Sequence, residues 1–150
     1  MIHVMASSVI NAPVSSIWRL IRDFGALGRW LPGVKSCVIE GDDSGDRVGA
    51  IRRLEMGDVG VIREQLLALS DVDHAVTFSI IESALPIRNY RSTISLLPIT
   101  ASNVTFIQWR GQFEASADHA ASMEARMPTQ IYQPAFERLA KILASESAPS

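Results

Sequence analysis

The sequence has one cysteine, few aromatic side chains and no long apolar run. Cys37 is the single cysteine among 150 residues, so no disulfide can form within the chain and a reducing, cytoplasmic setting is expected. Lys and Arg number 14 against 16 Asp and Glu, and no basic run is present, which argues against a nucleic-acid partner. No stretch approaches the roughly 18 apolar residues of a membrane-spanning helix, and no secretion signal is expected.

Spacings typical of metal and cofactor sites are also missing. His3, His74 and His119 lie far apart, and no His, Cys, Asp and Glu residues share the spacing of metal ligands. The acidic loop at 42–46 lacks the downstream glutamate of a calcium loop. There is no phosphate-binding glycine loop and no serine or cysteine nucleophile pattern. We therefore expect no metal ion and no cofactor.

The pattern that is present predicts one domain over residues 1–150, with 145–150 as a frayed polar tail. The chain is 47% hydrophobic and 20% charged, as ordinary globular proteins are. We expect a first strand at 3–10, a helix from Pro13 to Gly25, a short helix at 26–31 and a long helix from about Ala120 to Ala144. Six further strands are predicted at 34–40, 47–56, 60–70, 75–82, 89–97 and 103–114.

Short turns between these strands predict an α+β fold with a seven-stranded antiparallel sheet. One amphipathic helix is too narrow to cover seven strands lying flat. A curved sheet wrapped around the C-terminal helix, with two short helices after the first strand, solves this problem. A hollow is expected between sheet and helix.

The segment 78–92 gives the best indication of what fills the hollow. Tyr90 and Ser92 share one face of a predicted strand with Ile94 and Leu96. An apolar row with two hydroxyls suits the wall of a ligand cavity. The alternative is a core in which backbone groups or buried water satisfy both hydroxyls.

Two charged side chains are further candidates. Lys35 shares a predicted face with Cys37 and Ile39, either inward toward a ligand carboxylate or enolate, or outward in solvent. Glu64 lies in an apolar row, where it would be a general acid or base, or one half of a structural ion pair. The two side chains could also pair with each other.

Apolar residues are expected to complete the cavity. The strands and the loop after 82 supply the predicted wall residues Leu54, Met56, Phe78, Ile80, Leu85, Trp109 and Phe113. The long helix supplies Met127, Ile131 and Ala135 at helical spacing. Trp109 with Gly111 either shapes the pocket or packs plainly on the helix, and Pro134 should disturb the helix.

Four segments carry a resemblance to a known group of proteins. They are 33–40, 48–54, 63–66 and 89–92, and they resemble plant abscisic-acid receptors, which belong to the START-like or SRPBCC superfamily with the polyketide cyclase/dehydrase and Bet v 1-like families. The resemblance implies the helix-grip fold. It also implies that Lys35 binds a ligand carboxylate, that Glu64 orders a water network, and that the following residues line the pocket: Tyr90, Ser92, Met127, Ile131 and Ala135.

The resemblance does not extend to the receptors' gate and latch motifs. The segment 56–60 lacks the gate proline, and Leu85 stands where the latch has histidine. The leading hypothesis is a protein that binds a small, largely apolar ligand: a lipid, a polyketide-like molecule or an isoprenoid. The alternative is a cyclase or dehydratase in which Lys35 or Glu64 moves protons and Tyr90 holds an enolate oxygen. A third is a partner protein with a vestigial cavity, and an oligomer is compatible with each.

Overall fold

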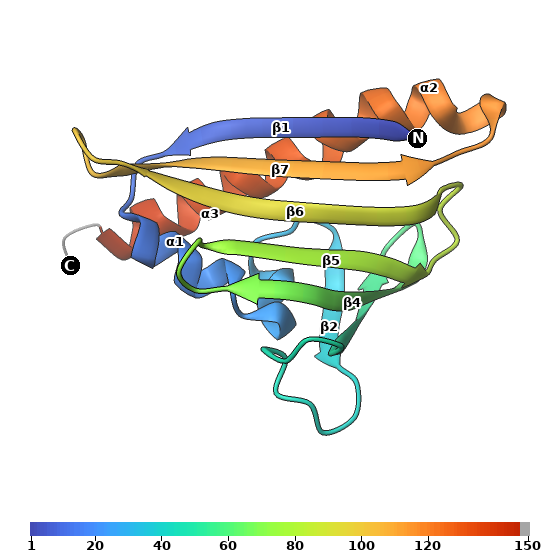
Figure 1. Ribbon diagram of the computed structural model, residues 1–150, viewed down its shortest axis with the longest axis horizontal. Coiled ribbons are helices and arrows are strands. Elements are labelled where there is room, and N and C mark those ends of the chain that lie inside the picture. The colour runs from blue at the N-terminus through green and yellow to red at the C-terminus, as the bar shows by residue number, and fades with distance from the viewer. Residues whose placement is uncertain (148–150) are drawn as a thin grey trace.

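The computed structural model describes residues 1–147 as one α+β unit (Figure 1). The strands are β1 (Ile2–Ile10), β2 (Val34–Ile39), β3 (Ile51–Met56), β4 (Gly60–Ser70), β5 (Ala75–Glu82), β6 (Arg88–Ile99) and β7 (Val104–Glu114). The helices are α1 (Val14–Ile21), the 3-10 helix η1 (Phe24–Arg29), α2 (Ala117–Arg126), the π-helical turn η2 (Met127–Tyr132) and α3 (Gln133–Ser147).

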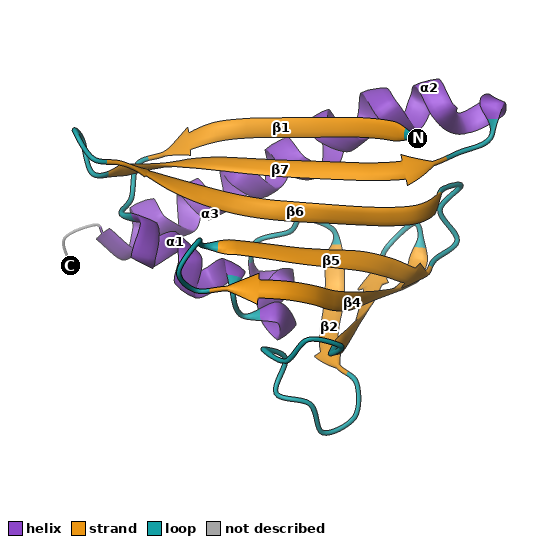
Figure 2. Cartoon of the chain, viewed as in Figure 1, coloured by secondary structure: helices purple, strands orange, loops and turns teal. Residues whose placement is uncertain are grey.

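All seven strands form one antiparallel sheet in the order β1-β7-β6-β5-β4-β3-β2. In Figure 2 the helices all lie behind the sheet, and β2 crosses the direction of β6, which shows how strongly the sheet curves. The continuous rod of α2, η2 and α3 passes diagonally across the concave side. The predicted helix-grip fold, with its two short helices after the first strand, is therefore confirmed.

The core lies between the concave face of the sheet and this rod. Alternate residues of β6 and β7 point inward and are buried, as the period of two predicts, whereas Arg91 and Thr93 point outward. Helix α3 packs against this face through a stripe of buried residues at helical spacing. This stripe consists of Ala135, Phe136, Leu139 and Leu143.

Several predicted boundaries differ from the structure. The first helix ends at Ile21 rather than at Gly25, the short helix spans Phe24–Arg29 rather than 26–31, and β6 extends to Ile99 rather than to residue 97. The third strand begins at Ile51 rather than at residue 47. Gly49 has a φ of 98°, which is not a strand conformation, so the strand can begin only after it. The long helix begins at Ala117 rather than at Ala120. It continues to Ser147, so the predicted frayed tail is helical over 145–147, and its last part, 148–150, lies outside the described residues.

The disturbance expected from Pro134 takes the form of the π-helical turn. Proline has no N–H, so Pro134 cannot donate to the carbonyl of Gln130, four residues earlier. Just before it, the N–H of Gln133 donates to the carbonyl of Pro128, five residues earlier. One extra residue in this turn rotates the helix on either side of it, so that Met127, Tyr132 and Ala135 are all buried.

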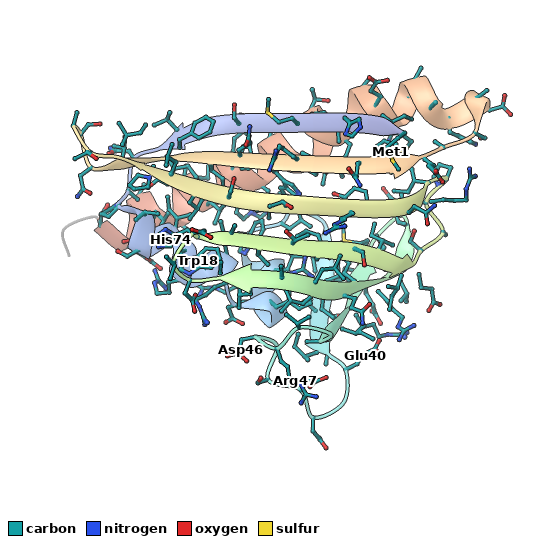
Figure 3. The ribbon with its side chains drawn as sticks, viewed as in Figure 1. Met1, Trp18, Glu40, Asp46, Arg47 and His74 are labelled. Carbon is teal, nitrogen blue, oxygen red and sulfur yellow. The ribbon has the colours of Figure 1, made fainter. Side chains whose placement is uncertain are left out.

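Helix α1 is tied to the β4–β5 turn by a polar cluster. The indole Nε1 of Trp18 donates to Asp71 Oδ1 at 2.8 Å, and Arg22 Nε donates to the same oxygen at 2.8 Å. These hydrogen bonds, Arg22 first, lower the pKa of the Asp71 carboxyl. The Trp18 and His74 rings pack edge to face with centroids 5.6 Å apart, and Figure 3 shows both side chains together at this end of the molecule. Among the helices of residues 1–147, none has the length and apolar character to cross a membrane.

Because α3 packs against the sheet through its buried stripe, truncating a residue of this stripe should lower the free energy of unfolding strongly. Leu139 is fully buried, so Leu139→Ala should lower the free energy of unfolding by about 2–5 kcal/mol through lost apolar contact and a new cavity. Leu97→Ala, at a side chain that is 62% exposed, is the matched control and should cost less than about 0.5 kcal/mol. Urea denaturation followed by circular dichroism measures both, and equal effects would contradict this account of the core.

Candidate functional site

A cavity of about 100 Å³ lies inside the curve of the sheet, beneath η1 and η2. Its wall is apolar apart from a few side chains that bring polar atoms to it, chiefly Arg52, Glu64, Tyr90 and Trp109. The complete wall consists of Leu27, Leu31, Arg52, Leu54, Met56, Val59, Ile62, Glu64, Phe78, Ile80, Leu85, Tyr90, Trp109, Met127 and Ile131. An apolar enclosure with few polar groups is typical of small-molecule sites.

Most of the residues predicted for the cavity lie on this wall. The structure brings together Leu54, Met56, Glu64, Phe78, Ile80, Leu85, Tyr90, Trp109, Met127 and Ile131. Three others, Ser92, Phe113 and Ala135, are buried but belong to the core behind the wall. The predicted inward face of β3 to β7 was therefore right, and the depth of these three positions was not.

Lys35 is the one predicted wall residue that points away, and its inward placement was wrong. It is exposed, and it lies at an irregularity where Val34 and Ser36 of β2 pair with the adjacent residues Met56 and Glu55 of β3. Lys35 is therefore the extra residue of a β-bulge, which breaks the strict alternation used to place it. It pairs neither with Glu64 nor with a group in the cavity.

The partner of Glu64 is Arg52, which the sequence analysis missed. The two residues lie directly opposite each other on β3 and β4, and Arg52 Nε donates to Glu64 Oε1 at 2.8 Å. Arg52 is only 3% exposed and Glu64 7%. The sequence contained a signal for this, because Arg52 alternates in step with Leu54 and Met56, which were predicted to face the cavity.

The Arg52 guanidinium has both polar and aromatic neighbours. A second nitrogen, Nη2, lies 2.8 Å from Glu64 Oε1, and Nη1 donates to the carbonyl of Phe24 at 3.1 Å. The guanidinium carbon lies 3.9 Å from the centre of the Phe24 ring and 4.6 Å from that of Phe78. Among the described residues nothing donates to the other Glu64 oxygen, Oε2, so this acceptor is free for a ligand on the cavity wall.

The tyrosine hydroxyls of the site form a buried pair. Tyr90 Oη and Tyr132 Oη lie 2.5 Å apart in a hydrogen bond, and the Tyr132 ring stacks on Trp109 with centroids 4.1 Å apart. Gly111 makes the arrangement possible, because a Cβ at that position would collide with Tyr132 Oη. The Trp109 and Gly111 combination thus serves to admit Tyr132, which the sequence analysis missed because its position depends on the π turn.

Hydrogen-bond donors crowd around the Tyr90 oxygen. Burial raises the pKa of Tyr90 to about 12, although nearby donors, Ser92 first, partly offset the effect. Burial also raises the pKa of Tyr132, and the proximity of Tyr90 adds to it. Ser92 Oγ and Trp109 Nε1 approach Tyr90 but complete no hydrogen bond. This end of the cavity therefore holds neutral tyrosines and a surplus of donors at neutral pH.

A second hollow adjoins the cavity at the surface. This mouth groove has a volume of about 390 Å³ and lies between α2, η2 and the loops that follow β3 and β5. Val59, Leu85, Met127 and Ile131 line both the mouth groove and the inner cavity. These four apolar side chains therefore separate the inner cavity from the mouth groove.

The pKa of Tyr90 predicts the behaviour of the protein in alkali. The chain has two tyrosines, both buried, and each has a pKa above the ordinary value of about 10. The fold favours their neutral forms, so this contribution to stability is complete below pH ~10 and is lost as the pH rises toward 12 and beyond. Absorbance at 295 nm should show no tyrosinate near pH 10 in folded protein, but should do so in urea. A native-state tyrosine titrating near pH 10 would contradict the buried pair.

The Arg52–Glu64 pair predicts an asymmetry between single and double substitution. Glu64→Gln leaves the buried guanidinium without its counter-charge and should lower the unfolding free energy by about 3–5 kcal/mol. Arg52→Met combined with Glu64→Leu removes both charges and should recover much of that loss. Glu82→Gln, in an exposed pair with Arg63, is the control and should have little effect. Urea denaturation of all four proteins provides the test, and a double variant that is less stable than Glu64→Gln would contradict it.

Comparison with known proteins identifies the family of the chain. The family model described as "Polyketide cyclase / dehydrase and lipid transport" matches residues 1–144. The abscisic acid receptor PYL10 of Arabidopsis thaliana is 29% identical over 90 residues, which are 58% of this chain and 48% of the receptor. The chain spans about half the length, 48% and 42%, of the curated relatives it matches.

Solved structures extend the likeness over the whole fold. A protein from Nitrosospira multiformis superposes with a TM-score of 0.78 at 32% identity, covering 97% of this chain and 98% of its own. Norcoclaurine synthase from Thalictrum flavum, in complex with dopamine and hydroxybenzaldehyde, has a TM-score of 0.76 over 98% of this chain and 88% of its own. At 16% identity the latter shows the shared fold alone. With the family match running from the first strand into α3, the chain belongs to the polyketide cyclase / dehydrase and lipid transport family.

Proposed function

We propose that this protein binds a small, largely apolar ligand that bears oxygen atoms, in the cavity between the sheet and the long helix. The observation that carries the proposal is an apolar wall on which a few polar atoms stay without partners. Glu64 Oε2 can accept a hydrogen bond from a ligand hydroxyl, while Trp109 Nε1 is a buried donor with no acceptor. Buried polar atoms are rarely left unpaired, so a ligand or water oxygen beside Trp109 would remove a real cost.

The ligand classes proposed from the sequence fit this wall. A lipid, a polyketide-like molecule or an isoprenoid offers an apolar body together with one or two carbonyl or hydroxyl oxygens. Burial of its apolar surface contributes about 25 cal/mol per Å², and the polar atoms select its orientation. The lone thiol of Cys37 supports a cytoplasmic setting for this binding.

An enzyme of the cyclase or dehydratase type is the second candidate. Its support is that an acceptor and a donor group share one small cavity: the negative charge of Glu64 lies close enough to help raise the pKa of Tyr90. In this reading Glu64 moves the proton and Tyr90 or Trp109 holds the developing negative oxygen. Lys35, the other predicted proton carrier, has no place in it, because it lies outside the cavity.

Occupying the cavity with protein atoms should abolish binding. Ile80→Trp adds bulk directly on the cavity wall, whereas Ile81→Trp, one residue along the same strand, adds it at a side chain that is 43% exposed. Native mass spectrometry of gently purified protein should find a co-purifying molecule in the unaltered protein and in Ile81→Trp. Its occupancy should fall at least about tenfold in Ile80→Trp, since covering ~100 Å² less apolar ligand loses about 2.5 kcal/mol.

Circular dichroism must show that both variants keep the native fold. Equal retention of the ligand by the two variants would place its site elsewhere in the molecule. It would then favour the third hypothesis, a cavity that is vestigial because Trp109, Phe78 and Met127 fill it.

A further inference from the structure

The inner cavity is too small to hold a whole ligand of the proposed classes. Its volume is about 100 Å³, whereas an apolar protein cavity that binds benzene has a volume of roughly 150 Å³. Sites for larger small molecules typically have volumes of about 300–1,000 Å³. The remaining part of the ligand must therefore lie beyond the wall of the inner cavity.

The mouth groove provides this additional space. Its volume of about 390 Å³ lies in the range of small-molecule sites, and four residues line it together with the inner cavity. Ile131, one of the four, is a large apolar side chain that is 39% exposed at this position. Met127, another of the four, is flexible enough to move aside for a chain passing between the two spaces. The two hollows are thus two parts of one elongated site.

Arg126 gives the outer part of this site its chemical character. It is exposed at the end of α2, and its Nε donates to the Gln130 side chain at 3.1 Å. Within residues 1–147 it forms no ion pair, and no Asp or Glu lines the mouth groove. Its two terminal nitrogens are therefore free to bind a carboxylate or another planar anion through two parallel hydrogen bonds.

The other cations considered for a ligand cannot take this role. Arg52 is on the inner wall, but the carboxylate of Glu64 already neutralises its charge and the Phe24 carbonyl takes a further donor. Lys35 lies in the bulge of β2 and lines neither hollow. We propose that the ligand is amphipathic, with its apolar end in the inner cavity and an anionic group at the other end bound by Arg126 in the mouth groove. This inference rests on the proposed function, since it extends the same site outward.

Octanoate and 1-octanol test this proposal, because they share an eight-carbon chain and differ in the charge of the end group. Isothermal titration calorimetry at low ionic strength should show octanoate binding about two- to fivefold more tightly, the range for a partly exposed ion pair. Arg126→Gln should abolish the preference and leave the affinity for octanol unchanged. Arg138→Gln removes an exposed arginine of α3 that lines neither hollow, and it should preserve the preference.

The outcomes separate this inference from the function on which it rests. If both probes bind equally and Arg126→Gln changes neither affinity, the anion site is overturned while the apolar cavity stands. If octanoate is preferred but Arg126→Gln and Arg138→Gln weaken it alike, the preference is a general charge effect and the site is again overturned. If Ile80→Trp, rather than Ile81→Trp, abolishes binding of both probes, the inner cavity holds their chains as proposed. If neither probe binds the unaltered protein, both proposals fail for aliphatic ligands.

Discussion

The buried ion pair between Arg52 and Glu64 is the constraint on which the site depends. Two charges taken out of water cost several kcal/mol each, and close pairing with each other offsets this cost. This requirement fixes the register of β3 against β4, because the two residues must stand opposite each other. It also draws η1 over the end of the sheet, since the carbonyl of Phe24 takes one guanidinium donor and the Phe24 and Phe78 rings both pack against the group. The cavity wall is built around this pair.

The other end of the cavity is built around the π turn. An uninterrupted α-helix would carry Tyr132 to a different angle from Met127 and Ala135, and the hydroxyl pair with Tyr90 would be lost. Two features of the sheet receive the tyrosine: the absent side chain of Gly111 and the flat face of Trp109. The long helix therefore does more than cover the sheet, since it supplies one half of the polar cluster next to the cavity.

These two clusters give the cavity opposite chemical properties at neighbouring points on its wall. The Glu64 carboxylate accepts hydrogen bonds, while the tyrosine cluster is rich in donors. Each cluster satisfies its own charges and hydroxyls largely within the protein, so a ligand has few polar contacts to gain and must derive most of its affinity from apolar burial. Such a wall favours orientation of an apolar molecule over strong polar binding, and it leaves the entrance groove to discriminate between ligands.

The sequence by itself determined the fold and the faces of its strands. The element order, the short turns and the alternation along 90–96 and 107–113 required an antiparallel sheet curved around one helix, because apolar periodicity fixes which face of a strand is buried. Most of the cavity wall followed from the same alternation. Lys35 did not, because a bulge adds one residue to a strand and reverses its parity without any mark in the composition. The tertiary structure alone decided that Arg52 is the partner of Glu64 and that Tyr132 reaches Tyr90, since both contacts join elements whose approach depends on packing across the whole core.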